Sequence, residues 1–582
     1  MRALSPVEPE LRPRRRAVAR WGGALGAAAF YATAAVLLTW PLFRRPASTV
    51  VSAAADVLLT VWILAWDVHA LVTRPLELFH ANIFYPARYT LALAEHLLGN
   101  LPAFAPVYLL TGNPVLAHEA TLLASFVIAG LAMAAYVLHW TRDGGAALAA
   151  GFLYAFAPFR LWQMIELHYI AIQWLPLVAL AIDLVLHGAR PRAAAVGLAG
   201  VVLVSSLCSY YVGYATFLLA AIYTASAVRA RGRPAMARLA LVAVALVAAA
   251  GVVALVSVPY LYLRRAGIIP DYTANGFASL GFIGMAVYGL FGQLAFYVVS
   301  QRGPVPEFLT YTGLALALVG ILRRRGHPRG GLLAVAVLGL LLSLGHVLAA
   351  PWTRPIPLPY AWLAAVVPGF SSMRLPQRFG ALVTLATAAF AGFGLATLRR
   401  ALMTRGRGGA ARVLPALVIL LLAVEVRPPP ITPATLPVGP AIPPAYGWLA
   451  AHGEGAALLE LPTAALFLER QAFAMYYSTA HWLPLANGYS AYPPHPYVDI
   501  IGTLEQMPRA DALDAILAAL PVRWVLVHRE AILPSWWPRW EVVLEPRLQR
   551  VAEFGEAVLF EVPARPPDAR GPVPSGQRVE QP

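Results

Sequence analysis

Two carboxylates, Asp56 and Asp67, stand in the otherwise apolar stretch VVSAAADVLLTVWILAWDVHALV at residues 50–72. On one helix their spacing corresponds to about three turns, or about 16 Å, so they would share a face but could not act on the same atom. A positioned carboxylate can take the proton of a hydroxyl nucleophile. Asp56 could do this, or it could be a first-turn carboxylate that satisfies backbone N–H groups. Asp67 is expected on the solvent-facing side of a helix that Trp62 and Trp66 anchor at a membrane interface.

Pairs of arginines could bind a phosphate group, because a guanidinium can donate two parallel hydrogen bonds to phosphate oxygens. Arg374 and Arg378 are four residues apart with Gln377 between them, so on a helix both arginines would share one face. We expect this pair to be the phosphate site. Two further pairs are Arg44 with Arg45 and Arg264 with Arg265. Each pair could instead reach ordinary lipid headgroups.

A second polar cluster lies in FRLWQMIELH, and its members are Arg160, Gln163, Glu166 and His168. The spacing of three residues suits a polar helix face that lines a cavity. Glu95 and His96, in LALAEHLLGN, form a similar pair. With Asp56 and His168, this pair could supply ligands for Mg²⁺ or Mn²⁺, although no spacing demands a metal. A structural role is the alternative for each of these side chains.

One loop near the C-terminus, LANGYSAYPPHPY at 485–497, is rich in glycine, proline and aromatic residues. Aromatic faces are good platforms for sugar rings, so the loop could bind an acceptor, or it could be a rigid turn. The sequence contains no P-loop, dinucleotide fingerprint, nucleophile elbow or HExxH motif. Its single cysteine, Cys208, provides neither a disulfide framework nor a cysteine metal site.

The amino-acid composition indicates the kind of fold that must position these residues. The chain has 582 residues, of which 59% are hydrophobic and 12% charged, and its mean hydropathy is +0.65. This is too apolar for a soluble protein of this size and predicts a multi-span membrane protein. The net charge of +16 comes from arginine clusters between apolar segments, as in cytoplasmic loops, so we expect no nucleic-acid partner.

Apolar runs long enough to cross a bilayer predict eleven spans. They lie near 21–41, 115–139, 145–159, 169–187, 193–209, 211–228, 237–260, 308–322, 331–350, 377–398 and 413–426. Three shorter or interrupted stretches, 57–73, 97–111 and 277–300, are expected to be interfacial or re-entrant.

The basic loops predict the orientation. If the basic segment 1–20 is cytoplasmic, nearly all the predicted inner loops carry arginines. The long first loop, 42–114, is then on the outer face, as is everything after about residue 427.

After the last predicted span, the sequence pattern is no longer that of membrane-spanning helices. Residues 427–444 form a proline-rich linker, and 445–563 predict a small α/β domain on the outer face. In that domain 456–462, 522–528 and 557–563 read as strands and 509–520 as an amphipathic helix. The tail, 564–582, has a disordered composition. The predicted fold is therefore mainly α: a polytopic helical membrane domain, 21–426, followed by a small α/β domain.

Several motifs resemble the GT-C superfamily of polytopic glycosyltransferases, in particular its bacterial YfhO-like branch. They are DVLLTVWILAW at 56–66, YAFAPFRLWQMIELHYIAIQWLPL at 154–177, PGFSSMRLPQRF at 368–379 and the VRWVLVH strand of the terminal domain. The resemblance implies a sugar donor linked to polyprenyl phosphate or diphosphate. It also implies that Asp56, in the first outer loop, is the base or a metal ligand.

The leading hypothesis is a glycosyltransferase on the outer face of a bacterial inner membrane. It would move a sugar from the lipid-linked donor to a glycan, lipid or protein acceptor of the envelope. One alternative is a transporter or flippase of a lipid-linked substrate, and another is a non-catalytic membrane protein of envelope biogenesis.

Overall fold

The computed structural model describes residues 11–231, 236–272, 308–323, 326–348, 356–426, 428, 430–463 and 468–563. The chain forms two compact units. The membrane unit comprises Met1–Phe79 and Leu91–Gly439, and the C-terminal unit comprises His80–Thr90 and Pro440–Pro582. The predicted 277–300 segment and the tail 564–582 lie outside the described residues.

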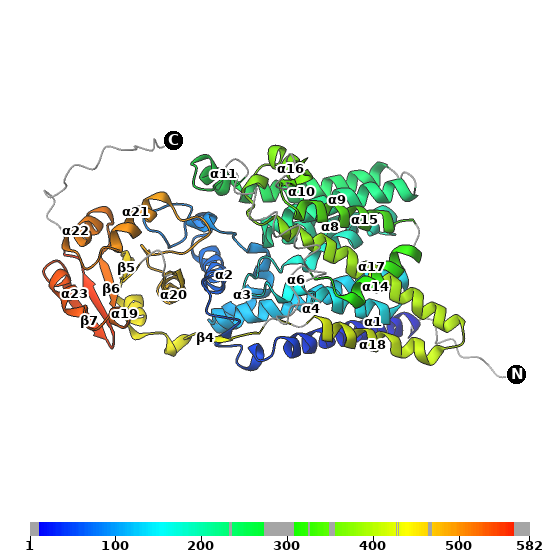
Figure 1. The fold of residues 1–582 in the computed structure, drawn as a ribbon, viewed down its shortest axis with the longest axis horizontal. Helices are drawn as coiled ribbons and strands as arrows, with labels where there is room; N and C mark the ends of the chain where they lie inside the picture. The colour runs from blue at the N-terminus through cyan, green and yellow to red at the C-terminus, as the bar shows by residue number, and fades with distance from the viewer. Residues whose placement is uncertain are drawn as a thin grey trace. The chain divides into compact units, whose positions relative to one another are not determined.

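Every predicted span corresponds to a helix of the membrane unit (Figure 1). These helices are α1 (Leu11–Leu38), α4 (Pro114–Thr141), α5 (Gly144–Ala155), α7 (Leu175–His187), α8 (Pro191–Cys208), α9 (Tyr210–Arg231), α10 (Met236–Val256), α14 (Tyr311–Arg323), α15 (Arg329–Ser343), α17 (Gly380–Thr404) and α18 (Gly408–Glu425). Within the described ranges, eight helical stretches are long and apolar enough to cross a bilayer, and four more are apolar but shorter. The chain is therefore a multi-pass membrane protein with a mainly helical fold.

Local sequence explains where several of these helices begin. The Asn113 side chain accepts a hydrogen bond from the Leu116 N–H at 3.0 Å, and Pro114 occupies the first helical position of α4. Asp143 caps α5 in the same way, by accepting from the Ala146 N–H at 2.9 Å. Such caps satisfy backbone donors that have no partner inside the helix.

Glycines allow two of the helices to pack closely. A Cβ atom on Gly320 of α14 would overlap the Phe390 carbonyl of α17, and one on Gly394 of α17 would overlap the Leu316 carbonyl of α14. Membrane helices gain stability from such backbone approach, since lipid offers no hydrophobic driving force between them. The pair α14–α17 therefore depends on residues without side chains.

Helix α2 (Ala55–Thr73) corrects one prediction. Most of this helix is buried within the protein, so its tryptophans do not form an exposed interfacial face. Trp62 and Trp66 are 1% and 0% exposed, and Trp66 Nε1 donates to the Leu78 carbonyl at 2.8 Å. Asp67 is also fully buried, so the prediction that it lies on a wet face is wrong.

Shorter elements complete the membrane unit. Of these, the site uses α6 (Pro158–Leu161), α11 (Val258–Arg265), α16 (Pro359–Val366) and the 3₁₀ turns η7 (Phe370–Ser372) and η8 (Pro376–Phe379). Helix α3 (Leu101–Thr111), in the predicted stretch 97–111, leaves Leu109 and Leu110 exposed. Strand β1 (Thr49–Val50) pairs antiparallel with β4 (Ala434–Thr435), so part of the predicted linker joins a small sheet of the membrane unit.

The C-terminal unit contains a four-stranded sheet in the order β5-β6-β8-β7. Its strands are β5 (Leu458–Leu461), β6 (Trp524–His528), β7 (Gln549–Phe554) and β8 (Ala557–Glu561); β5 and β6 are parallel, and the other pairs are antiparallel. The surrounding helices are α19 (Pro444–His452), α20 (Leu468–Ser478), α21 (His495–Leu504), α22 (Ala510–Ala519) and α23 (Trp537–Leu544). The predicted strands β5, β6 and β8 and the predicted helix α22 are present.

A short segment from the first loop forms part of the C-terminal unit, which the sequence did not indicate. The amides of Phe84 and Tyr85 donate to the Asn487 and Leu485 carbonyls at 3.1 and 3.0 Å. The ring of Phe84 lies where a Cβ atom on Gly488 would be. The segment 80–90 is therefore held by the loop at 485–497 within the C-terminal unit.

Candidate functional site

Asp56 lies in the first turn of α2 and is half-buried. The helix begins after Ala54, an N-cap in extended conformation whose amide donates to Ser52 Oγ at 3.3 Å. A carboxylate in a first turn is favoured by the partial positive charge of the helix N-terminus. This local position fits both readings of Asp56, the first-turn carboxylate and the base.

Glu166 links Asp56 to the two predicted phosphate-binding arginines. Burial raises the pKa of the Glu166 carboxyl, while Arg378 and Arg374 lower it and the negative charge of Asp56 raises it further. Glu166 Oε2 accepts a hydrogen bond from Arg378 Nη2 at 2.8 Å. Because all three charges act on the same carboxyl, the fold brings together residues that are far apart in the sequence.

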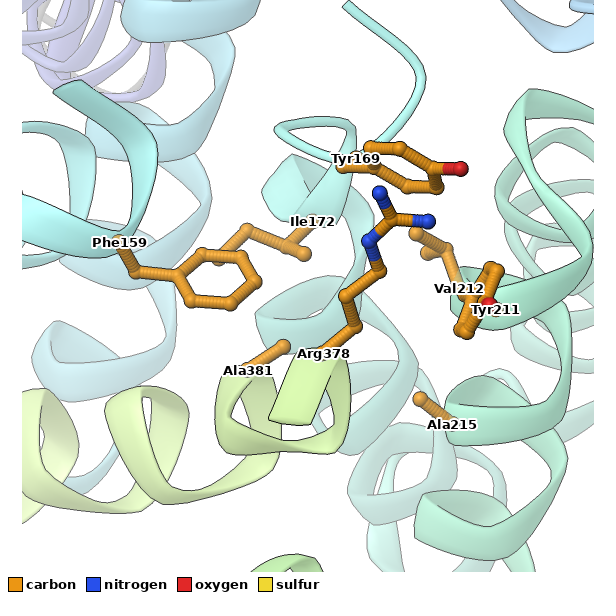
Figure 2. A pocket seen from close by; sticks show the side chains of 8 residues that line it. All are labelled: Phe159, Tyr169, Ile172, Tyr211, Val212, Ala215, Arg378 and Ala381. Carbon is orange, nitrogen blue, oxygen red and sulfur yellow. The ribbon is translucent and has the colours of Figure 1, made fainter. Parts of the chain in front are cut away.

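Arg378 is the buried member of this group, with 7% of its surface exposed. Figure 2 shows its guanidinium between the rings of Tyr169 and Tyr211. It also shows Phe159 and Ile172 lining the same small pocket. Ion pairing together with stacking on aromatic faces fixes an arginine in one orientation.

Arg374 differs from Arg378 because its side chain is exposed. The two arginines do not share a helical face, since η8 begins only at Pro376. A residue that precedes proline is displaced from the helical conformation, and Leu375 has φ −121° and ψ 80°. Gln377 is half-buried within η8. The predicted helical pairing is therefore wrong.

The loop that carries Arg374 is held on both sides. The Met373 carbonyl accepts from the Tyr360 hydroxyl at 2.9 Å, and the Leu375 amide donates to the Tyr211 hydroxyl at 2.9 Å. Tyr360 belongs to α16 and Tyr211 to α9. The fold therefore presents an exposed guanidinium from a fixed backbone.

Glu95 and His168 form a partly buried pair next to Arg378. Glu95 Oε1 accepts from the Ser209 hydroxyl at 3.0 Å and from the Tyr210 amide at 2.9 Å, at the start of α9. Its Oε2 is 3.8 Å from His168 Nε2. Burial raises the pKa of Glu95 to about 7, although Ser209 and Arg378 lower it. Burial, followed by the charge of Arg378, holds the pKa of His168 well below its usual value.

His96 does not join this pair. It is 3% exposed, its Nδ1 accepts from the Leu98 amide at 3.3 Å, and its ring packs edge-on against Phe79, Tyr210 and Tyr260. Burial lowers its pKa to about 4. His96 is a neutral member of an aromatic cluster, and its surroundings favour a structural role over substrate binding.

Arg160 and Gln163 are also placed differently from the prediction. Helix α6 ends at Leu161, so Arg160, Gln163 and Glu166 do not line one helical face. Arg160 is fully buried and donates to the Ile170 and Ala155 carbonyls and to Ser125 Oγ, at 2.8 to 3.0 Å. The Arg160 guanidinium therefore makes structural hydrogen bonds inside the protein. Gln163 is half-buried in the turns that follow α6.

The other arginine pairs lie in separate surroundings. Arg264, on α11, donates to Asp271 Oδ2 at 2.9 Å and to Ser371 Oγ at 2.7 Å, and it also binds Ser372. Arg265 and Arg44 are exposed, as is Arg45. Arg264 therefore ties α11 to η7, two residues before Arg374.

Two solved structures resemble the chain over most of its length. One is the arabinofuranosyltransferase AftD from Mycobacteria, with a TM-score of 0.60 and 18% identity over 94% of this chain and 40% of that chain. The other is the Archaeoglobus fulgidus oligosaccharyltransferase in complex with Zn and sulfate, with a TM-score of 0.52 and 14% identity over 91% and 71%. The chain thus corresponds to two fifths of AftD. Comparisons with protein-family models and with curated proteins found no match.

The chain has a GT-C fold.

Within this GT-C fold, no three histidine, cysteine, aspartate or glutamate side chains of the described ranges form a group that could hold a metal ion. The predicted ligands are divided: Glu95 faces His168, His96 is enclosed by aromatic rings, and Asp56 acts on Glu166. Among the described residues, the four candidate ligands are therefore not brought together as one group.

The sequence did not single out the aromatic residues that shape the candidate site. Tyr169 and Tyr211 flank Arg378, and Tyr360 holds the backbone before Arg374. Tyrosine is common in the chain, which has 24 of them, so nothing in their local spacing distinguished these three. Only the packing of distant segments gives them a role.

Proposed function

We propose that the chain is a membrane glycosyltransferase that takes a sugar from a polyprenyl-phosphate or polyprenyl-diphosphate donor. The observation that carries the proposal is the ion pair between Glu166 Oε2 and Arg378 Nη2, 2.8 Å apart, within a GT-C fold. The charges of Arg374 and Asp56 also shift the pKa of this carboxyl, which supports placing both residues in the same site. The fold is shared with the arabinofuranosyltransferase AftD and with the Archaeoglobus fulgidus oligosaccharyltransferase AglB. One structure of AglB is a complex with an inhibitory peptide and a dolichol-phosphate. The site offers a carboxylate that can act as a base and an exposed guanidinium that can bind a phosphate.

Asp56 is the proposed base. Its carboxylate takes the proton of the acceptor hydroxyl while that oxygen bonds to the anomeric carbon and the anomeric bond to the donor phosphate breaks. The phosphate oxygen keeps the bonding electron pair, so negative charge develops on the leaving lipid phosphate. Donors already in place at that position lower the barrier.

Arg374 is the proposed donor to that phosphate. Its side chain is exposed, whereas Arg378 is buried, paired with Glu166 and stacked between two tyrosines. Arg378 then contributes positive charge and holds Glu166, while Arg374 makes the direct hydrogen bonds. The phosphate site that the sequence predicts at the pair is therefore proposed at Arg374, with Arg378 behind it.

The proposed acceptor is a glycan, lipid or protein of the cell envelope, and the proposed location is the outer face of a bacterial inner membrane. In that orientation the N-terminus is cytoplasmic and the C-terminal unit is extracytoplasmic. The basic loops between the helices support this orientation through the positive-inside trend.

The test is Asp56→Asn in membranes that contain the native acceptors, supplied with a panel of sugars linked to undecaprenyl phosphate. The released undecaprenyl phosphate is measured, with Glu77→Gln as the matched control, since Glu77 is an exposed carboxylate of the same loop. We expect Asp56→Asn to abolish release and Glu77→Gln to leave it unchanged at equal protein abundance. Full release by Asp56→Asn would overturn the proposal, and substrate translocation without release would indicate a transporter.

A further inference from the structure

The Glu95 carboxylate binds the backbone at the start of α9. Helix α8 ends at Cys208 and α9 begins at Tyr210, so a single residue, Ser209, separates the two helices. Glu95 Oε1 accepts from the Ser209 hydroxyl at 3.0 Å and from the Tyr210 amide at 2.9 Å. The first amides of a helix have no partner within that helix, and a carboxylate is favoured there. Glu95 therefore fixes the first turn of α9 from another segment of the chain.

The segment that carries Glu95 is itself held in place. The carbonyl of the preceding residue, Ala94, accepts from the Tyr260 hydroxyl at 2.7 Å. Four residues after Glu95, Gly99 lies so close to α8 that a Cβ atom would overlap the Val204 carbonyl. Because the segment is bound on both sides of Glu95, the carboxylate can act as a fixed point for the start of α9.

The second residue of α9, Tyr211, contacts both arginine-bearing parts of the candidate site. The centre of its ring lies 4.8 Å from the guanidinium carbon of Arg378, as Figure 2 shows. Its hydroxyl oxygen accepts from the Leu375 amide at 2.9 Å. Leu375 directly follows Arg374 in the chain. The placement of the first turn of α9 therefore sets the placement of the backbone next to Arg374.

We infer that Glu95 is a positioning residue for Arg374 and acts through Tyr211. The Glu95 carboxylate holds the amide of Tyr210, and the hydroxyl of the next residue holds the amide next to Arg374. A binding group that is held in its bound orientation loses less entropy when the ligand binds. The inference rests on the proposed binding of the donor phosphate by Arg374. It gives Glu95 a role that needs no contact with the substrate.

The test distinguishes the hydrogen bonds of Glu95 from its charge. The purified whole chain in lipid nanodiscs is titrated with undecaprenyl phosphate. Glu95→Ala removes the acceptor, whereas Glu95→Gln keeps an oxygen that can accept from the same two groups. We expect the affinity to fall roughly 3- to 10-fold in Glu95→Ala, as for loss of about one net hydrogen bond, and to stay within about twofold of the wild type in Glu95→Gln.

Tyr211→Phe removes only the hydroxyl, so it should cause a loss similar to that of Glu95→Ala. Tyr214→Phe is the matched control, because Tyr214 also belongs to α9 and its hydroxyl donates to a different backbone group, the Pro368 carbonyl, at 2.6 Å. We expect this control to bind as the wild type does. Glu95→Ala and Tyr211→Phe are each also combined with Arg374→Ala. Neither should weaken binding further in that background, because both act through Arg374.

The possible contrary results have different meanings. Wild-type affinity in Glu95→Ala or Tyr211→Phe, beside a loss in Arg374→Ala, would overturn the inference and leave the phosphate site in place. An equal loss in Glu95→Gln would show that the charge matters and not the hydrogen bonds. Losses that add to that of Arg374→Ala, or an equal loss in Tyr214→Phe, would show an effect that does not pass through Arg374. Unchanged binding by Arg374→Ala would overturn the phosphate site and the inference together.

Discussion

Arg374→Ala should weaken phosphate binding without weakening the fold. The guanidinium is exposed, and the backbone around it is held by tyrosine hydroxyls, so the free energy of unfolding should change by no more than about 0.5 kcal/mol. A hydrogen bond to a charged group contributes about 1.5–3 kcal/mol. Since about 1.4 kcal/mol corresponds to a tenfold change, the affinity for a lipid phosphate should fall by roughly 10- to 150-fold.

The assay is binding of undecaprenyl phosphate to the purified chain in nanodiscs, titrated for the wild type, Arg374→Ala and Arg265→Ala. Arg265 is the matched control, because it is also an exposed arginine and lies at the end of α11. Unchanged binding by Arg374→Ala would refute the role given to Arg374. An equal loss in Arg265→Ala would show that binding responds to general positive charge at the bilayer surface.

The remaining predictions concern buried ion pairs in the two units. Glu166→Gln leaves Arg378 without its carboxylate partner. Breaking a buried pair costs about 3–5 kcal/mol, but the Glu166 side chain is 21% exposed, so we expect the free energy of unfolding in detergent to fall by about 1–3 kcal/mol. A stability equal to that of the wild type would contradict the pairing. Burial alone lowers the pKa of His528, but its bonds to Glu460 and Glu530 raise the pKa to about 9 from 6.5. Their stabilisation, roughly 3 kcal/mol at most, should be complete below pH 6.5 and lost as the pH rises through about 9. Thermal unfolding of the wild type and of His528→Gln should therefore converge at high pH, and a pH-independent difference would argue against the charged pair.

The helices of the membrane unit could be predicted because a span must be apolar over a fixed length, which is a local property of the sequence. The three core strands of the C-terminal unit carried a similarly local pattern. The segment 80–90 could not be assigned, because its pairing with 485–487 depends on residues about 400 positions away. Neither the hydrophobic periodicity of the segment nor a turn motif within it indicates a pairing partner so far away in the sequence.

The site was predicted least well where helical spacing was assumed. Trp62 and Trp66 have the spacing of one face of an interfacial helix, with Asp67 expected on its solvent side, yet all three are buried. Pro376 prevents Arg374 from joining the helix of Arg378, and α6 ends before Gln163. The residue types were informative in each case, while their surroundings depended on packing between distant segments.

The most direct test of the central claim is a cryo-EM structure of the Asp56→Asn chain with an undecaprenyl-phosphate-linked sugar. We expect the donor phosphate to lie within hydrogen-bond distance of Arg374 and the anomeric carbon to face position 56. A donor bound elsewhere on the membrane unit, with neither position in contact, would contradict it.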